Sequence, residues 1–296
     1  MNPQIAVVVV SYNTRALLLE CLASVIESSR EAEIELIVVD NASRDGSYEA
    51  VREAFPQAVT VRNSTNIGFG VACNQAIRRT TAPFILLLNS DARINTDALQ
   101  AILDAMRFDE RCGAASCRIV NDEGEEMINT RNFLTPLNQA LELLGFKRRA
   151  YRPKPEDNNL DCSVEWIDGA CLMLRRAALD EVGLFDEQFF MYSEDEDLCF
   201  RLKERGWKVC FSSAATVFHR GAASSSQDRT NMLRHFYSSQ MLFLSKHRGR
   251  ASVFLFRLAM KTALTLKLLL ARLKSQDKRR EEFAERLFAL KRASEF

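Results

Sequence analysis

The sequence is poor in the residues that mark several protein classes. Its 296 residues include only six Pro, 11 Gly and three His. So little Pro and Gly excludes collagen-like and linker-rich chains. Lys and Arg (40) almost balance Asp and Glu (39), which leaves a net charge of +1. Because no basic field dominates the chain, we expect no nucleic-acid partner.

Several nucleotide-binding and hydrolase motifs are missing as well. The chain has no G-x-x-x-x-G-K-[ST] motif, no G-x-S-x-G motif, and no G-x-G-x-x-G after its first apolar run. These motifs place phosphates on a helix N-terminus or a nucleophile on a sharp turn. Their absence excludes a P-loop and the Rossmann dinucleotide fingerprint.

The eight cysteines include no C-x-x-C pair, which excludes a zinc ribbon and a thioredoxin motif. Several lie in apolar runs, where reduced Cys behaves as a small core residue. We therefore expect a reducing, cytoplasmic compartment. The N-terminus, MNPQIAVVVVSYN, has no basic region before its apolar run, so we expect no signal peptide.

Short apolar runs alternate with helical patterns over the first 110 residues. The pattern predicts strands at Ile5–Val10, Ile34–Val39, Ala58–Arg62 and Phe84–Leu88, and helices at Ala16–Ile26, Asp45–Ala54, Gly70–Arg79 and Thr96–Arg107. Such alternation is typical of an α/β fold with a Rossmann-like, mostly parallel sheet flanked by helices. Ligands of these sheets bind beyond the carboxyl ends of the strands. We therefore expect a site built from the loops Ser11–Thr14, Asp40–Ser47, Asn63–Phe69 and Asn89–Asn95.

The alternation stops after Gly113. The later pattern predicts a hairpin at Cys117–Thr130, a mobile polar loop at Tyr151–Leu160 and a strand-like stretch at Val164–Leu174. It then predicts a helix at Leu198–Arg205, with carboxylates ahead of it, and two short strands at Lys208–Phe211 and Thr216–Phe218. From Arg229 onward all signals are helical. We expect a catalytic domain over residues 1–240 and a C-terminal helical extension over residues 241–296.

Two aspartates directly follow predicted buried strands. Asp40 follows ELIVV and Asp91 follows FILLLNS. At such a position, Asp40 could accept hydrogen bonds from a nucleobase or a ribose. Asp91 could hold a divalent cation against a diphosphate, since hard cations favour carboxylate oxygen. The alternative is that each caps the helix that follows it.

Four consecutive acids, Glu194 to Asp197, precede an amphipathic helix and follow apolar aromatics. Partial desolvation in such surroundings raises a carboxyl pKa toward neutrality, as a general base needs. The alternative is that these acids only favour the positive helix N-terminus. His219 follows a short strand, where it is either a packing residue or a metal ligand.

Seven motifs then occur in order: VVVVSYN, IVVDNASRDGS, NIGFGVACNQAI, LLLNSD, GACLMLRR, VGLFDEQFFMYSEDEDLCFRLKERGWKV and FHRGAAS. Together they resemble the glycosyltransferase family 2 enzymes with the GT-A fold, and most closely the rhamnosyltransferase-like branch. The resemblance covers roughly residues 4–245. It implies inverting transfer of a sugar from a nucleoside diphosphate sugar to a glycan or lipid-linked acceptor, with Mg²⁺ or Mn²⁺, in cell-surface polysaccharide synthesis. L-rhamnose is the first sugar to expect.

The same resemblance implies roles for particular residues. Asp195 would be the general base, with Glu194 orienting the acceptor. Asp91 and His219 would hold the metal, although the D-x-D motif reads Asn89-Ser90-Asp91 and lacks its first acid. The remaining residues would bind donor or sugar: Ser11, Tyr12, Asp40, Asn66 and Asn74 on the donor, and Trp166, Asp168, Gly169 and Ala170 beside the sugar and acceptor.

Two other functions compete with this one. The missing D-x-D acid would suit a catalytically inactive GT-A-like module that only binds nucleotide sugars. A nucleotidyltransferase also uses a Rossmann-like sheet and a carboxylate-held metal. It would usually carry a Gly-rich, basic loop after the first strand, whereas this chain has SYNTRA there.

The C-terminal segment is basic. From Met241 to Phe296 there are 14 Lys and Arg against five Asp and Glu. Within Val253–Leu270 and just beyond it, Arg257, Lys261, Lys267 and Arg272 fall in an arc of about 160° on a helix. This pattern predicts a basic amphipathic helix that lies peripherally on an anionic membrane, at its cytoplasmic face. The alternative is a helix packed on the catalytic body or on a second copy of the chain, with its basic face in water; Asp277–Phe296 would then be a lid or an oligomer contact.

Overall fold

The computed structural model describes residues 3–29, 33–145, 151, 160–221 and 229–293. Most of the predicted polar loop after Tyr151 therefore lies outside the described residues. The predicted strands form β1 (Ile5–Ser11), β2 (Ile34–Asp40), β3 (Val59–Arg62) and β4 (Phe84–Asn89). They pair in parallel in the order β3-β2-β1-β4. This half of the sheet confirms the expected parallel architecture.

The sheet continues beyond β4 with strands of mixed direction. Over the described ranges the whole sheet has ten strands. Beyond β4 its main path runs through β11 (Cys171–Arg175), β6 (Cys112–Val120), β12 (Lys208–His219) and β5 (Ala92–Arg93). β11 is antiparallel to both β4 and β6, whereas β12 is parallel to β6. Shorter strands complete the structure: β7 (Glu126–Met127) on β6, β9 (Leu160–Asp161) on β12, and a separate pair of β8 (Thr130–Arg131) and β10 (Trp166–Ile167).

Helices cover both faces of the sheet. Alternate residues of β1 explain this, because Ile5 and Val7 belong to one core and Ala6 and Val8 to the other. The first core is closed by α1 (Arg15–Ser28), α2 (Ser47–Ala54) and α4 (Thr96–Phe108), and the second by α3 (Phe69–Ile77), α6 (Arg176–Val182) and α7 (Glu194–Glu204). The structure therefore has the predicted α/β fold.

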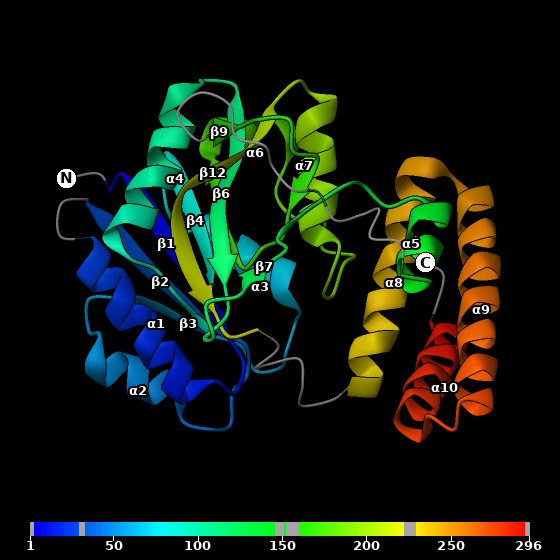
Figure 1. Cartoon of the computed structure of the whole chain (residues 1–296). Helices are drawn as coiled ribbons and strands as arrows, with labels where there is room; N and C mark the ends of the chain where they lie inside the picture. The colour runs from blue at the N-terminus through cyan, green and yellow to red at the C-terminus, as the bar shows by residue number, and fades with distance from the viewer. Residues whose placement is uncertain (1–2, 30–32, 146–150, 152–159, 222–228, 294–296) are drawn as a thin grey trace.

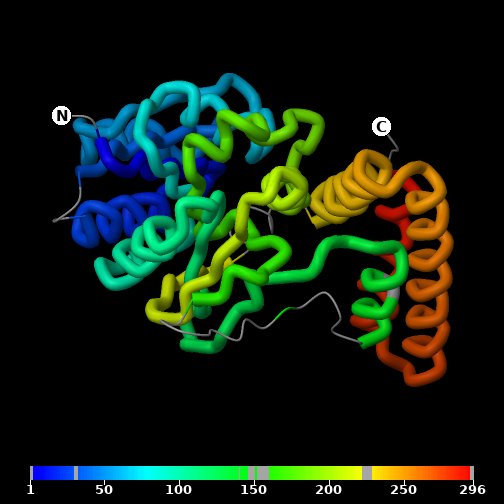
Figure 2. Tube along the Cα trace, turned by 90° about the horizontal axis from the view of Figure 1, so that it is seen from above, coloured from blue at the N-terminus to red at the C-terminus, as the bar shows by residue number. Residues whose placement is uncertain are grey.

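The C-terminal helices form a unit with a core of its own. α8 (Arg229–Arg248), α9 (Arg250–Leu273) and α10 (Asp277–Arg292) stand beside the sheet, with α5 (Pro136–Leu143) packed against α9 (Figures 1 and 2). Phe243, Phe256 and Leu264 lie in its centre. α8 begins at Arg229 and passes through residue 240, next to the predicted domain boundary, without a break. Within the part of the chain described, none of the helices combines the length and apolarity that a membrane span needs.

Three predicted elements differ from the structure. The strand-like stretch Val164–Leu174 is interrupted between β10 and β11. The two short strands predicted over Lys208–Phe218 are one strand, whose register shifts between Ser212 and Thr216. The helix predicted from Leu198 begins at Glu194, so the four acids form its first turn instead of preceding it, where the helix N-terminus favours negative charge.

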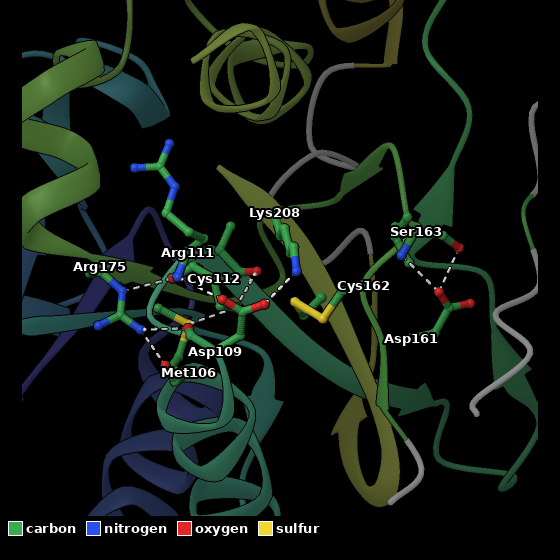
Figure 3. The surroundings of a disulfide bond; sticks show 12 residues. Met106, Asp109, Arg111, Cys112, Asp161, Cys162, Ser163, Arg175 and Lys208 are labelled. Carbon is green, nitrogen blue, oxygen red and sulfur yellow. Dashed lines mark hydrogen bonds and ion pairs between the residues drawn. A yellow bond between two sulfur atoms is a disulfide. The ribbon is translucent and has the colours of Figure 1, made fainter. Parts of the chain in front are cut away.

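A disulfide corrects the expectation of reduced cysteines. Cys162 is bonded to Cys210, whereas the other six are free and buried among the described residues (Figure 3). β9 runs antiparallel to β12 with Phe211 opposite Asp161, so Cys162 faces Cys210 across the pair. The 48-residue separation of the two cysteines gives no sign of this contact in the sequence.

Candidate functional site

The four predicted loops meet at the carboxyl edge of the parallel strands. The hydroxyl groups of Thr14 and Ser90 lie 2.9 Å apart, which links the loop after β1 to the loop after β4. The side-chain amide of Asn41 donates to Asn66 Oδ1 at 2.8 Å, which links the loops after β2 and β3. Hydrogen bonds between loops fix the floor of a site, as expected for this class of sheet.

A cavity of about 1320 Å³ opens over these loops. It is larger than the roughly 300–1,000 Å³ typical of a site for one small ligand. Most of the predicted site residues line it: Tyr12, Asn66, Asp91, Trp166, Asp168, Gly169, Ala170, Glu194, Asp195 and His219. Segments far apart in the sequence therefore share one cavity that has room for two substrates.

Asp91 and His219 are in contact within this cavity. Pairing of His219 with Ala92 at the end of β12 places the imidazole Nε2 3.1 Å from Asp91 Oδ1. Burial opposes a charge on His219, but the hydrogen bond and the negative charge of Asp91 outweigh it and raise its pKa. Neither this aspartate nor Asp40 caps a helix, since Asn95 caps α4 and Gly46 precedes α2. The capping alternative is therefore excluded for both.

The Asp91–His219 pair fits a divalent cation that a substrate helps to hold. Among the described residues, no group of three or more His, Cys, Asp or Glu side chains is placed to hold a metal. Mg²⁺ and related cations are often held by one or two protein ligands, with substrate phosphates and water completing the shell. Asn89, which stands where the first D-x-D acid is missing, has its amide nitrogen 3.2 Å from His219 Nε2.

Asp195 is far from Asp91 in the sequence but lines the same cavity. Its Oδ2 accepts a hydrogen bond from the backbone N–H of Gly169 at 2.8 Å, and its Oδ1 accepts one from Glu196 N–H at 2.8 Å. Burial raises the pKa of Asp195, and the two N–H donors only partly offset this. A Cβ on Gly169 would lie 3.3 Å from the Phe69 ring. Glycine thus lets this backbone approach the carboxylate.

Two more carboxyl groups adjoin Asp195. Burial and the charge of Asp195 raise the pKa of Asp168 to about 7. Burial and the same charge raise the pKa of Glu194 well above its ordinary range, and its Oε2 has no hydrogen-bond partner among the described residues. Neighbouring carboxyls in a partly desolvated site resist ionising together. This wall of the cavity can therefore hold or accept protons near neutral pH.

The backbone before α7 is strained. Tyr192 and Ser193 have φ angles of 70° and 61°, in the left-handed region that residues other than Gly seldom occupy. Two residues before Tyr192, the carbonyl of Phe190 accepts a 2.9 Å hydrogen bond from Phe69 N–H. A Cβ on Gly68 would collide with the Phe190 carbonyl. Contact with the loop after β3 thus fixes the strained turn that presents Glu194 and Asp195.

Three predicted donor residues do not line the cavity. Ser11 is buried, and its hydroxyl lies 3.0 Å from that of Thr14. Asp40 is buried beneath the loops, accepts from Ser43 N–H at 3.2 Å, and keeps Oδ1 without a partner among the described residues. The Asn74 side-chain amide donates to the Phe185 carbonyl and the Glu187 carboxylate, and its Oδ1 accepts from Phe185 N–H, so Asn74 holds that turn in place.

The prediction missed the wall opposite the sheet. Residues of the C-terminal helices line it, among them Tyr237, Gln240, Lys267, Arg279, Glu282, Phe283 and Arg286. Arg131 of β8 also faces the cavity. Its positive charge offsets part of the rise in the pKa of Asp168 and Asp195. The excess of basic residues in the C-terminal segment was the signal for this wall, but a helix pattern does not show which side meets the catalytic body.

Residues 6–183 match the profile of Glycosyl transferase family 2. The chain is 28% identical over 267 residues to an N-acetylglucosaminyl-diphospho-decaprenol L-rhamnosyltransferase of Mycobacterium tuberculosis, covering 84% of this chain and 87% of that protein. It is 22% identical over 209 residues to a poly-beta-1,6-N-acetyl-D-glucosamine synthase of Staphylococcus aureus, covering 69% of this chain and 47% of that protein.

Solved structures share the fold. A mannosyltransferase of Pyrobaculum calidifontis, in complex with GDP-Man and Mn²⁺, superposes with a TM-score of 0.60 at 18% identity, over 98% of this chain and 86% of that one. GalNAc-T7 with UDP, GalNAc and Mn²⁺ gives a TM-score of 0.59 at 14% identity, over 82% of this chain and 48% of that one. At these identities the likeness concerns the fold alone.

Proposed function

Because this chain belongs to glycosyl transferase family 2, we propose that it is an inverting glycosyltransferase that moves a sugar from a nucleoside diphosphate sugar to a hydroxyl group of a glycan or lipid-linked acceptor. One observation carries the proposal: Asp195 and the Asp91–His219 pair line the same cavity. Similarity to an L-rhamnosyltransferase that acts on a lipid diphosphate supports L-rhamnose as the sugar and cell-surface polysaccharide synthesis as the process.

The reaction is a single displacement. Asp195 takes the proton of the acceptor hydroxyl, and the oxygen forms a bond to the anomeric carbon as the bond to the diphosphate breaks. The electron pair of the broken bond stays on the diphosphate, and the configuration of the sugar inverts. The N–H groups of Gly169 and Glu196 hold the carboxylate in position. A raised pKa suits a base that works near neutral pH.

Asp91 and His219 would hold a Mg²⁺ or Mn²⁺ ion at the leaving-group end of the cavity. The bound cation supplies positive charge beside the diphosphate oxygens. Tyr12 and Asn66, which line the cavity, would meet the nucleotide, with Asp40 buried beneath them.

A donor screen with product analysis tests this function. We expect one nucleoside diphosphate sugar to raise the melting temperature with Mn²⁺ present, and slow hydrolysis of that sugar with inversion, seen by NMR of the released anomer. Stabilisation without any turnover by the wild type would instead indicate a nucleotide-sugar binding module without catalysis. No stabilisation and no turnover by any nucleotide sugar would contradict both.

The C-terminal unit adds a proposed membrane contact. Of the four basic residues in the predicted arc, Arg257 donates to the Ala293 carbonyl at 2.8 Å and Lys267 lines the cavity, whereas Lys261 and Arg272 are exposed. Large apolar side chains are also exposed along α9: Phe254, Leu255, Leu258, Leu266, Leu269, Leu270 and Leu273. An exposed apolar face on a segment with 14 basic and five acidic residues suits an anionic membrane surface.

A further inference from the structure

The cavity contains a second charged cluster that the transfer chemistry does not use. Lys267 of α9 and Arg279 and Arg286 of α10 line its wall opposite the sheet. The Lys267 ammonium lies 5.2 Å from the centre of the Phe283 ring, and the Arg286 guanidinium lies 2.9 Å from Glu282. The cluster thus belongs to the C-terminal unit, whereas the predicted metal ligands lie in the turn between β4 and β5 (Asp91) and at the end of β12 (His219).

The basic groups of this cluster are not fully compensated by the protein. Burial and then the charge of Arg286 lower the pKa of Lys267, which shows that the like charges are close enough to repel. The Nε of Arg286 is buried and has no hydrogen-bond partner among the described residues. A buried donor without a partner costs free energy. A ligand that brings anionic oxygen atoms would remove both costs.

We propose that Lys267, Arg279 and Arg286 bind the diphosphate group of a lipid-linked acceptor, at a subsite separate from the donor diphosphate. This rests on the proposed function, which places the acceptor hydroxyl at Asp195. Guanidinium groups bind phosphate oxygens in pairs, and an ammonium adds a point charge. The cavity exceeds the volume one ligand needs, so a second diphosphate has room in it.

The surroundings of Lys267 favour a lipid on this diphosphate. Its neighbour Leu266 and the next-turn residue Leu270 are exposed on the outer face of α9. A diphosphate held at Lys267 therefore lies beside an apolar surface, along which an acyclic hydrocarbon chain can leave the cavity. A charged head inside and an apolar exit outside match an amphipathic acceptor better than a free glycan.

Calorimetric binding of farnesyl diphosphate tests the subsite. The donor site is first filled with Mn²⁺ and the nucleoside diphosphate that stabilises the protein most. We expect farnesyl diphosphate to bind this complex and farnesol to bind at least tenfold more weakly. Arg286→Gln and Lys267→Met should each weaken farnesyl diphosphate at least tenfold. Arg280→Gln should bind it like the wild type, because that exposed α10 residue pairs with Asp277 and does not line the cavity.

Each other outcome overturns the subsite. Displacement of the nucleotide by farnesyl diphosphate would mean one shared diphosphate site. Equal binding of farnesol would mean an apolar contact only, and unchanged binding by the variants would place the diphosphate elsewhere. If Arg286→Gln does not fold, the exposed Arg279→Gln replaces it. Nucleotide binding and donor hydrolysis are read separately, so failure of this subsite differs from failure of the proposed transfer.

Discussion

The carboxylate of Asp195 lies 2.8 Å from the backbone N–H of Gly169, and this bond joins the first turn of α7 to the break between β10 and β11. The break and the helix start are two of the three places where a predicted element differs from the structure. Both serve the same purpose, since an unbroken strand at 168–170 would pair its N–H groups within the sheet instead of pointing one at a carboxylate.

Asp195→Asn is expected to keep donor binding and to lower transfer by a factor of roughly 10² or more, because the amide cannot accept the hydroxyl proton. Donor affinity by thermal shift and transfer rate by product release are measured on the same preparation. Asp180→Asn is the matched control, an exposed carboxylate on α6 away from the cavity. Turnover near the wild-type rate would remove Asp195 from the role of base.

The rate should depend on pH through the same group. The base must be ionised, and burial raises the pKa of Asp195 above that of a free aspartate. The rate should therefore rise with pH through this raised pKa and level off above it, so that activity is lost as the solution becomes acidic. A rate profile from pH 4 to 9, with donor binding measured at each point, checks this; a flat profile down to pH 4 would contradict it.

Asp197 is predicted to stabilise the contact of α7 with α8. Its Oδ1 lies 2.7 Å from both His247 and Lys246, and its Oδ2 2.7 Å from Arg201. Burial alone would raise the pKa of Asp197, but these partners outweigh it and lower the pKa to about 2. Asp197→Asn should lower the free energy of unfolding by about 3 kcal/mol at pH 7, since it removes a fully buried charge that three basic side chains contact.

The pH dependence of that loss gives a second measurement. Because the folded pKa of Asp197 is lowered, its contribution is complete above the unfolded value of about 4 and disappears as the pH falls toward 2. Urea unfolding at pH 7 and pH 3 should therefore show a smaller difference between variant and wild type at pH 3. An equal difference at both values would assign the effect to packing.

Removal of the proposed metal ligands should separate nucleotide binding from cation binding. In the wild type, Mn²⁺ is expected to increase the thermal stabilisation given by the nucleoside diphosphate. Asp91→Asn and His219→Ala should lose that increment and keep the stabilisation seen without Mn²⁺, because the cavity-lining loops that carry Tyr12 and Asn66 would still hold the nucleoside. Asp104→Asn, an exposed carboxylate on α4, serves as control. A full Mn²⁺ increment in both variants would place the cation elsewhere.

The exposed face of α9 gives a membrane prediction. The triple variant Leu255→Ser, Leu258→Ser and Leu269→Ser should co-sediment at least several-fold less with anionic liposomes than the wild type, because it removes apolar surface without touching the core. Phe108→Ser, an equally exposed apolar residue on α4, should sediment as the wild type does. Equal sedimentation of the triple variant, or a change from dimer to monomer instead, would assign this face to a protein partner.

The sequence predicted the parallel half of the sheet well because its strands are apolar throughout and its helices follow at once. Local pattern sufficed there. The β10–β11 break, the continuous β12 and the Cys162–Cys210 pair depend on which strands become neighbours, and a linear pattern does not carry that information. Asn74 shows a different limit: an Asn in a family motif indicates a fixed amide, but only the fold shows that Phe185 and Glu187 occupy it.

The composite cavity has a consequence for how such an enzyme diversifies. The loops proposed to face the nucleotide belong to the sheet, whereas the opposite wall comes from the helices after Arg229, which have their own hydrophobic core. Drift in those helices can thus alter which receiver molecule is accepted while the sugar-delivering half stays intact. Chimaeras that exchange the helices after Arg229 between relatives would be a natural route to new linkages.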